Sequence, residues 1–184
     1  MNDGDDVYYG DDVTGGSGSD TLDMSQITAD TSVDLGSGSG GRGYASSAQS
    51  GNDVLWSIES FIGGAGNDTI TAGSAQNEMD GGVGNDVYRF LSASDADGDT
   101  ISSFEPGDKI DLSQIDANGS GPGKGTFTLV SEAFSGGGQI LVTHETGANG
   151  DVTVIQGNIE GDNGPDFSIS IRGRHDLTQD DFQL

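Results

Sequence analysis

Residues 63–89 read GGAGNDTIT, AGSAQNEMD and GGVGNDVYR, which are three consecutive segments of nine residues each. The first and third segments match the pattern GGxGxDxUx, in which U is a large apolar residue, at every defined position. The middle segment keeps only a polar residue at position six, Asn77, and an apolar residue at position eight, Met79. A nine-residue repeat of this form predicts a coil of short parallel strands, in which each unit is a turn followed by a strand.

The place of each residue type in the repeat predicts its role. Glycines permit backbone conformations that a Cβ atom would block, and they leave their carbonyl oxygens exposed in the turn. We expect the position-six carboxylates to point into the same concavity as these carbonyls. The side chains at position eight should turn inward and form a thin core; they are Ile70, Met79 and Tyr88.

Asp68 and Asp86 are 18 residues apart, which is the expected spacing of turns that stack on the same edge of the coil. Two carboxylates about 4 Å apart repel each other by roughly 4 kcal/mol at an effective dielectric constant near 20. We therefore expect a cation between them. The chain has no cysteine and only two histidines, so the available ligands are hard oxygen atoms. Such ligands favour calcium.

A second, less regular series of ligands is expected on the opposite edge. Glu59 lies 18 residues before Asn77, and Asp95 lies 18 residues after it. Upstream, GGSGSDTLD at residues 15–23 is a further full match to the repeat and predicts an earlier calcium turn. The candidate ligands in these turns are Gly16, Gly18, Asp20, Glu59, Gly63, Gly64, Gly66, Asp68, Asn77, Gly81, Gly82, Gly84, Asp86 and Asp95.

The segments around the repeat predict other structure. Residues 24–52 interrupt the register, and their composition predicts an irregular Gly/Ser-rich loop without a chemical role. Trp56 and Phe61 are expected to cap the apolar core of the roll. The sequence DADGD at residues 95–99 begins like an EF-hand loop but lacks its glutamate, so it predicts a turn that adds Asp95 or Asp99 as a ligand.

Residues 117–184 differ in character from the repeat. Alternating apolar runs at 126–130, 139–143, 151–156 and 166–172 are separated by turn signals such as GSGPGKG and DNGPD. This pattern predicts an antiparallel series of hairpins. We expect it to pack against the end of the roll and to cover its exposed edge.

Composition narrows the functional classes. The 31 acidic and six basic residues give a net charge of −25, which argues against direct nucleic-acid binding. With 33 glycines and 31% apolar residues, disorder is a competing interpretation. We expect a chain that is poorly ordered without metal and folds when metal binds, which agrees both with this composition and with the calcium repeat. No apolar run is long enough for a membrane span, and no signal-peptide pattern follows Met1.

Several segments together resemble the C-terminal domain of serralysin-type (M10) secreted metalloproteases, within the wider group of repeats-in-toxin (RTX) proteins. They are GGSGSDTLDMS, SIESFIGGAGNDTI, AQNEMDGGVGNDVYRF, DTISSFEPGDKIDLS, GDNGPDFSISIRG and the terminal DFQL. The resemblance implies a parallel β-roll that binds several calcium ions, joined to a β-sandwich-like cap. It places turn ligands at 63–68 and 81–86, with Glu59, Asn77 and Asp20 in other turns. It also matches Asp99 and Asp108 to acidic positions after the roll.

The resemblance further implies folding outside the cell and an uncleaved C-terminal signal for type I secretion. We therefore expect an all-β, monomeric chain with a roll at 1–100 and a cap with the signal at 101–184. The sequence lacks the HExxH zinc motif, because His144 and Glu145 are followed by a turn and His175 stands alone. We expect no enzyme activity on this chain and an attached catalytic domain upstream.

Polysaccharide binding is the alternative function, as in the RTX modules of alginate-modifying epimerases or adhesins. An anionic glycan would then need calcium bridges, because the basic residues are few and dispersed: Arg42, Arg89, Lys109, Lys124, Arg172 and Arg174. A third interpretation, the acidic surface of a halophile protein, explains the charge but not the 18-residue spacing.

Overall fold

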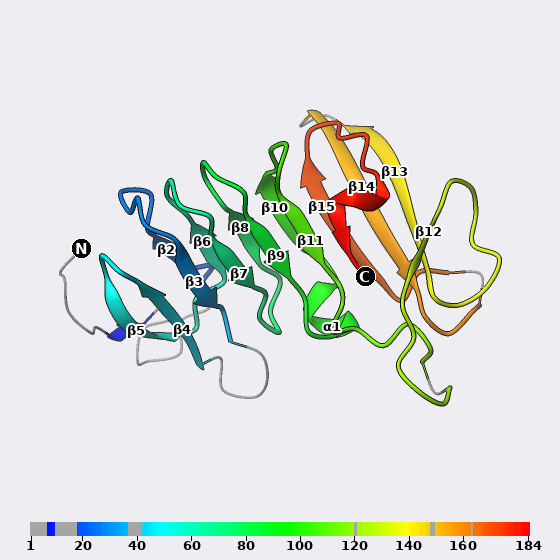
Figure 1. Ribbon diagram of the computed structural model, residues 1–184, viewed down its shortest axis with the longest axis horizontal. Helices are drawn as coiled ribbons and strands as arrows, with labels where there is room; N and C mark the ends of the chain where they lie inside the picture. Colours follow the sequence, from blue (N-terminus) through cyan, green and yellow to red (C-terminus); the bar gives the residue numbers. More distant parts are fainter. Residues whose placement is uncertain (1–6, 10–17, 37–41, 120, 148–149, 163) are drawn as a thin grey trace.

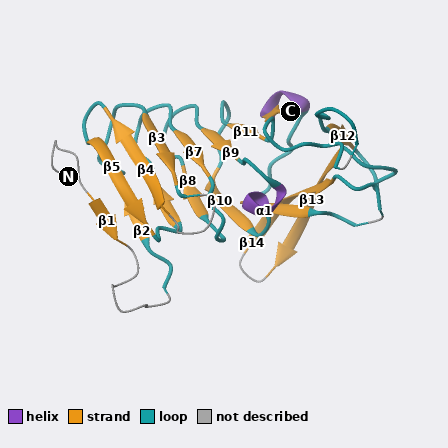
Figure 2. Ribbon diagram, turned by 90° about the horizontal axis from the view of Figure 1, so that it is seen from below, coloured by secondary structure: helices purple, strands orange, loops and turns teal. Residues whose placement is uncertain are grey.

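The computed structural model describes residues 7–9, 18–36, 42–119, 121–147, 150–162 and 164–184. Its strands form two sheets, each of eight strands in the described part of the chain (Figures 1 and 2). In order, sheet A holds β1 (Val7–Tyr9), β5 (Gly51–Trp56), β4 (Arg42–Ser47), β3 (Thr31–Asp34), β7 (Thr69–Thr71), β9 (Val87–Arg89), β11 (Lys109–Asp111) and β16 (Phe182–Gln183). Sheet B holds β12 (Thr128–Val130), β13 (Gln139–Gly147), β14 (Gly150–Asn158), β15 (Phe167–Arg172), β10 (Asp99–Ser103), β8 (Glu78–Asp80), β6 (Ser60–Ile62) and β2 (Thr21–Asp23).

Strands β6 to β11 form the roll, and they alternate between the two sheets along the chain. All pairs within it are parallel: β6 with β8, β7 with β9, β8 with β10, and β9 with β11. Each strand is short because the chain must turn to the other sheet after every few residues. This confirms the parallel β-roll that the nine-residue repeat predicts.

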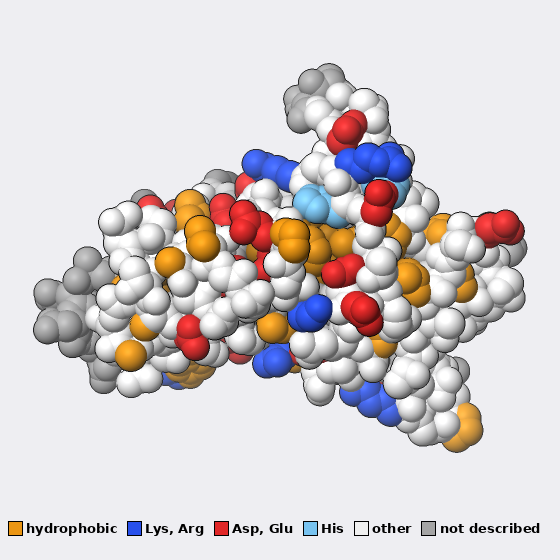
Figure 3. Space-filling model, turned by 45° about the horizontal axis from the view of Figure 1, so that its top comes forward, with side chains coloured by type: hydrophobic (Ala, Val, Ile, Leu, Met, Phe, Trp, Pro, Cys, Tyr) orange, Lys and Arg blue, Asp and Glu red, His pale blue; other side chains and the backbone are white. Residues whose placement is uncertain are grey.

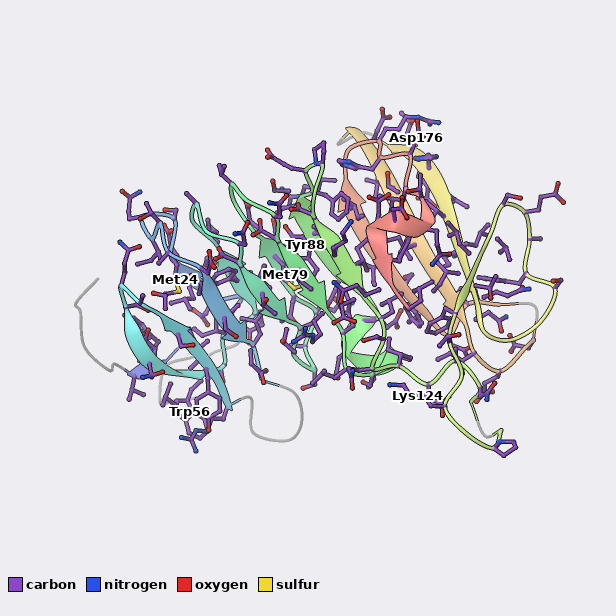
Figure 4. The ribbon with its side chains drawn as sticks, in the orientation of Figure 1. Met24, Trp56, Met79, Tyr88, Lys124 and Asp176 are labelled. Atoms are coloured by element: carbon purple, nitrogen blue, oxygen red, sulfur yellow. The ribbon has the colours of Figure 1, made fainter. Side chains whose placement is uncertain are left out.

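The core of the roll lies between its two sheets. Ile70, Met79 and Tyr88 are each 0% exposed, which confirms that position eight points inward. Figure 4 shows the side chains of Met24, Met79 and Tyr88 inside the roll. The Tyr88 hydroxyl donates to the Ser103 carbonyl at 2.6 Å and accepts from the Gly81 N–H at 2.9 Å. One buried side chain thus connects a turn of the roll to β10.

Part of the segment expected as an irregular loop forms a hairpin. β4 is antiparallel to both β3 and β5, and β5 is parallel to β1. Leu55 is fully buried and Phe61 is 1% exposed, whereas Trp56 is only half-buried. The expectation for Phe61 is therefore confirmed, and that for Trp56 is wrong. Because side chains alternate along a strand, burial of Leu55 places Trp56 on the outer face of sheet A.

The cap continues sheet B beyond the roll. β13, β14 and β15 pair antiparallel, as expected, but β12 pairs parallel with β13, which corrects the prediction of an uninterrupted hairpin series. β15 pairs with β10 and β16 pairs with β11, so the cap covers the end of the roll on both sheets. The sheets run past residue 100 without a break, and the division of the chain there stays a prediction.

Two short helices complete the described structure. α1 (Ala93–Ala96) follows β9 and begins at Ser92, whose side chain accepts from the Asp95 N–H. The 3₁₀ helix η1 (Gln179–Asp181) precedes β16. Within the described ranges, neither helix has the length and apolar character that a membrane crossing requires.

Replacement of Phe182 by alanine should destabilise the folded chain by about 3 kcal/mol, because it removes a large side chain from the core. Phe182 is 7% exposed and pairs with Ile110 where β16 joins β11. Chemical denaturation in calcium measures the effect. Gln183→Ala, on the exposed side of the same strand, is the matched control and should change stability by less than about 0.5 kcal/mol. Equal effects of the two substitutions would contradict a packed terminus.

Candidate metal-binding turns

The turns of the roll stack directly on one another. The Val83 N–H donates to the Gly64 carbonyl at 2.8 Å, which links turn 81–86 to turn 63–68. Gly82 has a φ of +86°, and a Cβ atom at this position would lie 2.2 Å from the Gly64 oxygen. Both the backbone conformation and the packing therefore require glycine here. The predicted turn glycines meet in pairs: Gly63 with Gly81, Gly64 with Gly82, and Gly66 with Gly84.

One edge of the roll carries the first ladder, which consists of Asp68, Asp86 and Asp108. The Asp68 N–H donates to Asp86 Oδ1 at 2.7 Å, and the Asp86 N–H donates to Asp108 Oδ1 at 2.9 Å. At the other end of the ladder, the Thr31 N–H donates to Asp68 Oδ1 at 2.7 Å. The three aspartates are at most 2% exposed. The structure thus brings together residues that the sequence separates by 18 and 22 positions.

The opposite edge carries the second ladder, which consists of Asp20, Glu59, Asn77 and Asp99. The Asp20 N–H donates to Glu59 Oε2 at 3.1 Å, and the Asn77 N–H donates to Asp99 Oδ1 at 2.8 Å. Asn77 Nδ2 donates to the Glu59 carbonyl at 3.1 Å. Gly18 lies beside Asp20, with a Cβ position 3.7 Å from Asp20 Oδ2. Gly16 falls outside the described residues.

Asp95 does not follow Asn77 in the second ladder, as its 18-residue spacing from Asn77 predicts. Asp99 takes that place and lies 22 residues beyond Asn77. The difference equals the four residues of α1, which lengthen the turn between β9 and β10. Asp95 is 6% exposed and lies close enough to Asp99 for its charge to act on that carboxyl. The same insertion makes the Asp86–Asp108 spacing 22 rather than 18.

Two carboxylate oxygens in the ladders point to an additional ligand. Asp86 Oδ2 and Asp99 Oδ2 are buried and accept no hydrogen bond from the described residues. A buried charged oxygen without a partner is costly, so such atoms are rare unless an ion or water completes them. One of these atoms lies in each ladder.

Burial and neighbouring charges raise the pKa values of the ladder carboxylates. Burial raises the pKa of Asp86 to about 6, and the charges of Asp108 and Asp68 add to this shift. Burial also raises the pKa of Asp99 to about 7, and the charge of Asp95 contributes. The pKa values of Asp68 and Asp108 are raised too, mainly by burial. A cation beside these carboxylates would favour their charged form and so offset the free-energy cost of burying the charges.

The donor set fits calcium better than a transition metal. In the described ranges no three His, Cys, Asp or Glu side chains gather closely enough to hold an ion by themselves. Each turn supplies one carboxylate or amide, so an ion between turns would need backbone carbonyl oxygens as further ligands. Calcium accepts mixed carboxylate and carbonyl ligands. Zinc and copper favour nitrogen and sulfur ligands.

Comparison with known families decides the identity of the fold. The family described as Peptidase M10 serralysin C terminal matches residues 10–184.

The chain belongs to this family.

The family is the C-terminal, non-catalytic part of M10 peptidases. No curated protein matches the chain. Among solved structures, the AlgE6R3 subunit from the Azotobacter vinelandii mannuronan C5-epimerase is similar in fold, with a TM-score of 0.53 and 22% identity. The match covers 95% of this chain and 82% of that one. It supports the β-roll fold of this serralysin C-terminal domain.

Asp53 is a further buried aspartate that the 18-residue spacing does not predict. It is 2% exposed and lies two residues before the buried Leu55, as Asp86 lies two residues before Tyr88. Asp53 lies inside β5, where it pairs with Ala45 of β4, whereas Asp68 and Asp86 lie immediately before β7 and β9. The signal in the sequence is the similarity of GNDVLW at 51–56 to GNDVYR at 84–89.

The two histidines lie together in the cap, away from the ladders. His144 Nε2 is 2.9 Å from the His175 carbonyl, and His175 Nε2 is 2.8 Å from the Arg172 carbonyl. Figure 3 shows the histidine side chains next to Lys and Arg side chains on the cap. The first contact holds the segment after β15 against β13; His144 lies inside β13, and His175 follows β15.

Acid should stabilise the serralysin-type roll in the absence of metal. In metal-free buffer, the folded fraction should rise as the pH falls from about 8 to about 5. The raised pKa values of Asp86 and Asp99, about 6 and about 7, mean that the fold binds these protons more tightly than the unfolded chain does. Stability is therefore present at low pH and is lost as the pH rises through these values. Far-UV circular dichroism measures the folded fraction at each pH. A flat profile over this range would contradict the raised pKa values of Asp86 and Asp99.

Proposed function

We propose that this chain is a calcium-binding module that folds when calcium fills the stacked turns. The observation that carries the proposal is the pair of buried, partnerless oxygens, Asp86 Oδ2 and Asp99 Oδ2, one in each ladder. Membership of the serralysin C-terminal family supports it. The proposed ions lie between successive turns, with Asp68, Asp86 and Asp108 on one edge and Asp20, Glu59, Asn77 and Asp99 on the other.

The physical basis is a balance between charge repulsion and ion binding. With a net charge of −25, the chain repels itself and favours expanded states at low calcium. A single ion at 100 times its dissociation constant adds about 2.7 kcal/mol to stability, and several sites add their effects. Because neighbouring rungs share hydrogen bonds, filling one turn positions the ligands of the next.

Folding on calcium would suit a secreted protein. Inside the cell calcium is scarce, so the chain would stay extended and pass through a type I secretion channel. Outside the cell calcium would fill the turns, and the folded module would stabilise an attached enzyme. We propose an upstream metalloprotease domain as that enzyme, an extracellular location, and an uncleaved export signal in the C-terminal segment that contains β16.

Isothermal titration calorimetry of the metal-free chain with calcium and, separately, with magnesium tests the proposal. Calcium should bind at several sites with a large heat and a gain of β-structure by circular dichroism. Magnesium prefers a rigid octahedral shell and keeps its water, so it should bind more weakly and induce less structure. Absence of calcium binding would overturn the proposal, as would equal responses to the two ions.

Polysaccharide binding is the second candidate function. Its support in this chain is the exposed outer face of the β4–β5 hairpin, which the roll itself does not require. The structurally similar epimerase subunit is, by its title, part of an enzyme that acts on mannuronan. A glycan-binding role would be compatible with calcium-driven folding, since the hairpin face and the ladders use different residues.

A further inference from the structure

The outer face of the β4–β5 hairpin presents side chains that the calcium ladders do not use. In the antiparallel pair, Arg42 lies opposite Trp56, Tyr44 opposite Val54, and Ser46 opposite Asn52. These residues alternate with inward-facing Gly43, Ala45, Asp53 and Leu55, all of which are buried. The hairpin therefore carries three outward rungs on one face.

Arg42 lies over two aromatic rings at one end of this face. Its guanidinium carbon lies 4.9 Å from the centre of the Tyr44 ring and 5.8 Å from that of the Trp56 ring. Tyr44 is 48% exposed. Figure 4 shows Trp56 pointing away from the body of the roll, at the end opposite the cap. Cation–π contacts of this kind fix the guanidinium in place while its outer edge can still donate hydrogen bonds.

The other end of the face opens into a polar hollow of about 570 Å³. Hydroxyl and amide side chains line most of it, including Ser32, Ser46, Asn52, Asn67 and Thr69. Asp30 also lines the hollow, and its Oδ1 accepts from the Asn67 N–H at 2.8 Å. Such a lining offers many donors and acceptors for hydroxyl groups. From Asn52 to Trp56 the face extends about 13 Å, since each strand residue advances about 3.3 Å.

Arg42 stands out electrostatically. It is the only Lys or Arg in the first 88 residues of a chain with 31 acidic residues. Four of the other cationic side chains contact an acidic residue or its backbone: Arg89 with Asp111, Arg172 with Glu78, Arg174 with Asp176, and Lys109 with the Asp180 carbonyl. Within the described ranges no carboxylate lies in ion-pair distance of Arg42. Among the described residues, its charge is therefore not paired.

We infer that the outer face of the β4–β5 hairpin binds a short oligosaccharide that contains a uronate, an inference that rests on the polysaccharide-binding function proposed above. A pyranose ring packs against the exposed side of the Tyr44 ring, and its carboxylate pairs with the Arg42 guanidinium beside Trp56. The adjoining sugar lies in the hollow, where its hydroxyls bond to Ser46, Asn52 and Asp30. The orientation follows from charge, because the ligand carboxylate is attracted to Arg42 and repelled by Asp30.

Tryptophan fluorescence tests this inference directly, because Trp56 is the only tryptophan in the chain. The calcium-saturated chain is titrated with a mannuronate trisaccharide and, in parallel, with the neutral cellotriose. The uronate should change the emission in a saturable way and bind more tightly than the neutral sugar. Absence of a saturable change with the uronate would overturn the inference. Circular dichroism in the same buffer shows whether the chain is folded, so a failure of calcium-driven folding is distinguishable from a failure of sugar binding.

Matched variants locate the site. Arg42→Gln should weaken uronate binding by about tenfold or more and leave cellotriose binding nearly unchanged. Tyr44→Ser should weaken binding of both sugars. Lys124→Gln, which removes the same charge from a distant loop of the cap (Figure 4), should change neither. Equal losses in Arg42→Gln and Lys124→Gln would indicate general charge attraction and would overturn the site.

Discussion

Asp86→Asn should have opposite effects on stability with and without calcium. In calcium, the substitution removes a charged ligand from the middle of the first ladder and should raise the calcium concentration at the folding midpoint at least about tenfold, or about 1.4 kcal/mol. Without calcium, asparagine keeps an oxygen for the Asp68 N–H, now bonded at 2.7 Å, and removes a buried charge. The metal-free fold should then gain on the order of 2 kcal/mol at about pH 8.

The reversal of sign separates a calcium ligand from a purely structural aspartate. The stability in calcium comes from chemical denaturation, and the folded fraction in a chelator comes from far-UV circular dichroism of the variant and the parent chain. Asp176→Asn is the control, since its side chain is 84% exposed in the cap, and it should be nearly silent in both conditions. If Asp86→Asn destabilised the chain equally with and without calcium, the carboxylate would serve hydrogen bonding alone.

Gly82→Ala should be among the most damaging single substitutions in the roll. The added methyl group would lie 2.2 Å from the Gly64 oxygen, and the residue would keep an unfavourable φ of +86°. Strain and overpacking together should cost about 3 kcal/mol or more. Because the clash pushes two turns apart, calcium affinity should fall with stability. Thermal unfolding at several calcium concentrations measures both changes.

Gly123→Ala is the matched control for backbone strain. Gly123 has a φ of +80°, and nothing lies within 4 Å of the Cβ position. Its replacement should cost only about 1–2 kcal/mol, the strain alone, and should not affect calcium affinity. Equal losses in the two variants would mean that turn stacking contributes little to the roll.

The central part of the fold could be predicted from the sequence because one periodicity sets both the strands and the turns. Position eight predicts the buried Ile70, Met79 and Tyr88, and an 18-residue spacing predicts the contact of Asp68 with Asp86. The serralysin resemblance, together with the turn signals, predicts the cap that covers the end of the roll. Each of these inferences depends on local pattern.

Other features of the fold could not be predicted from the nine-residue period. The spacing rule selected Asp95 instead of Asp99 because it does not register the four residues of α1. Trp56 was assigned to the core by its apolar character alone, although Leu55 beside it already fills the inward position. The parallel pairing of β12 with β13 depends on how residues 131–138 cross over between the two strands, which no turn signal there specifies. The β4–β5 hairpin was not predicted either, because the Gly/Ser-rich composition of residues 24–52 is typical of a loop.

Small-angle X-ray scattering of the whole chain, first in a calcium chelator and then in excess calcium, tests the central claim most directly. For 184 residues, a compact fold has a radius of gyration of about 16 Å and an unfolded chain about 46 Å. At about pH 8 the account predicts an expanded chain in chelator that contracts toward the compact value as calcium fills the turns. The same compact radius in both conditions would contradict calcium-driven folding.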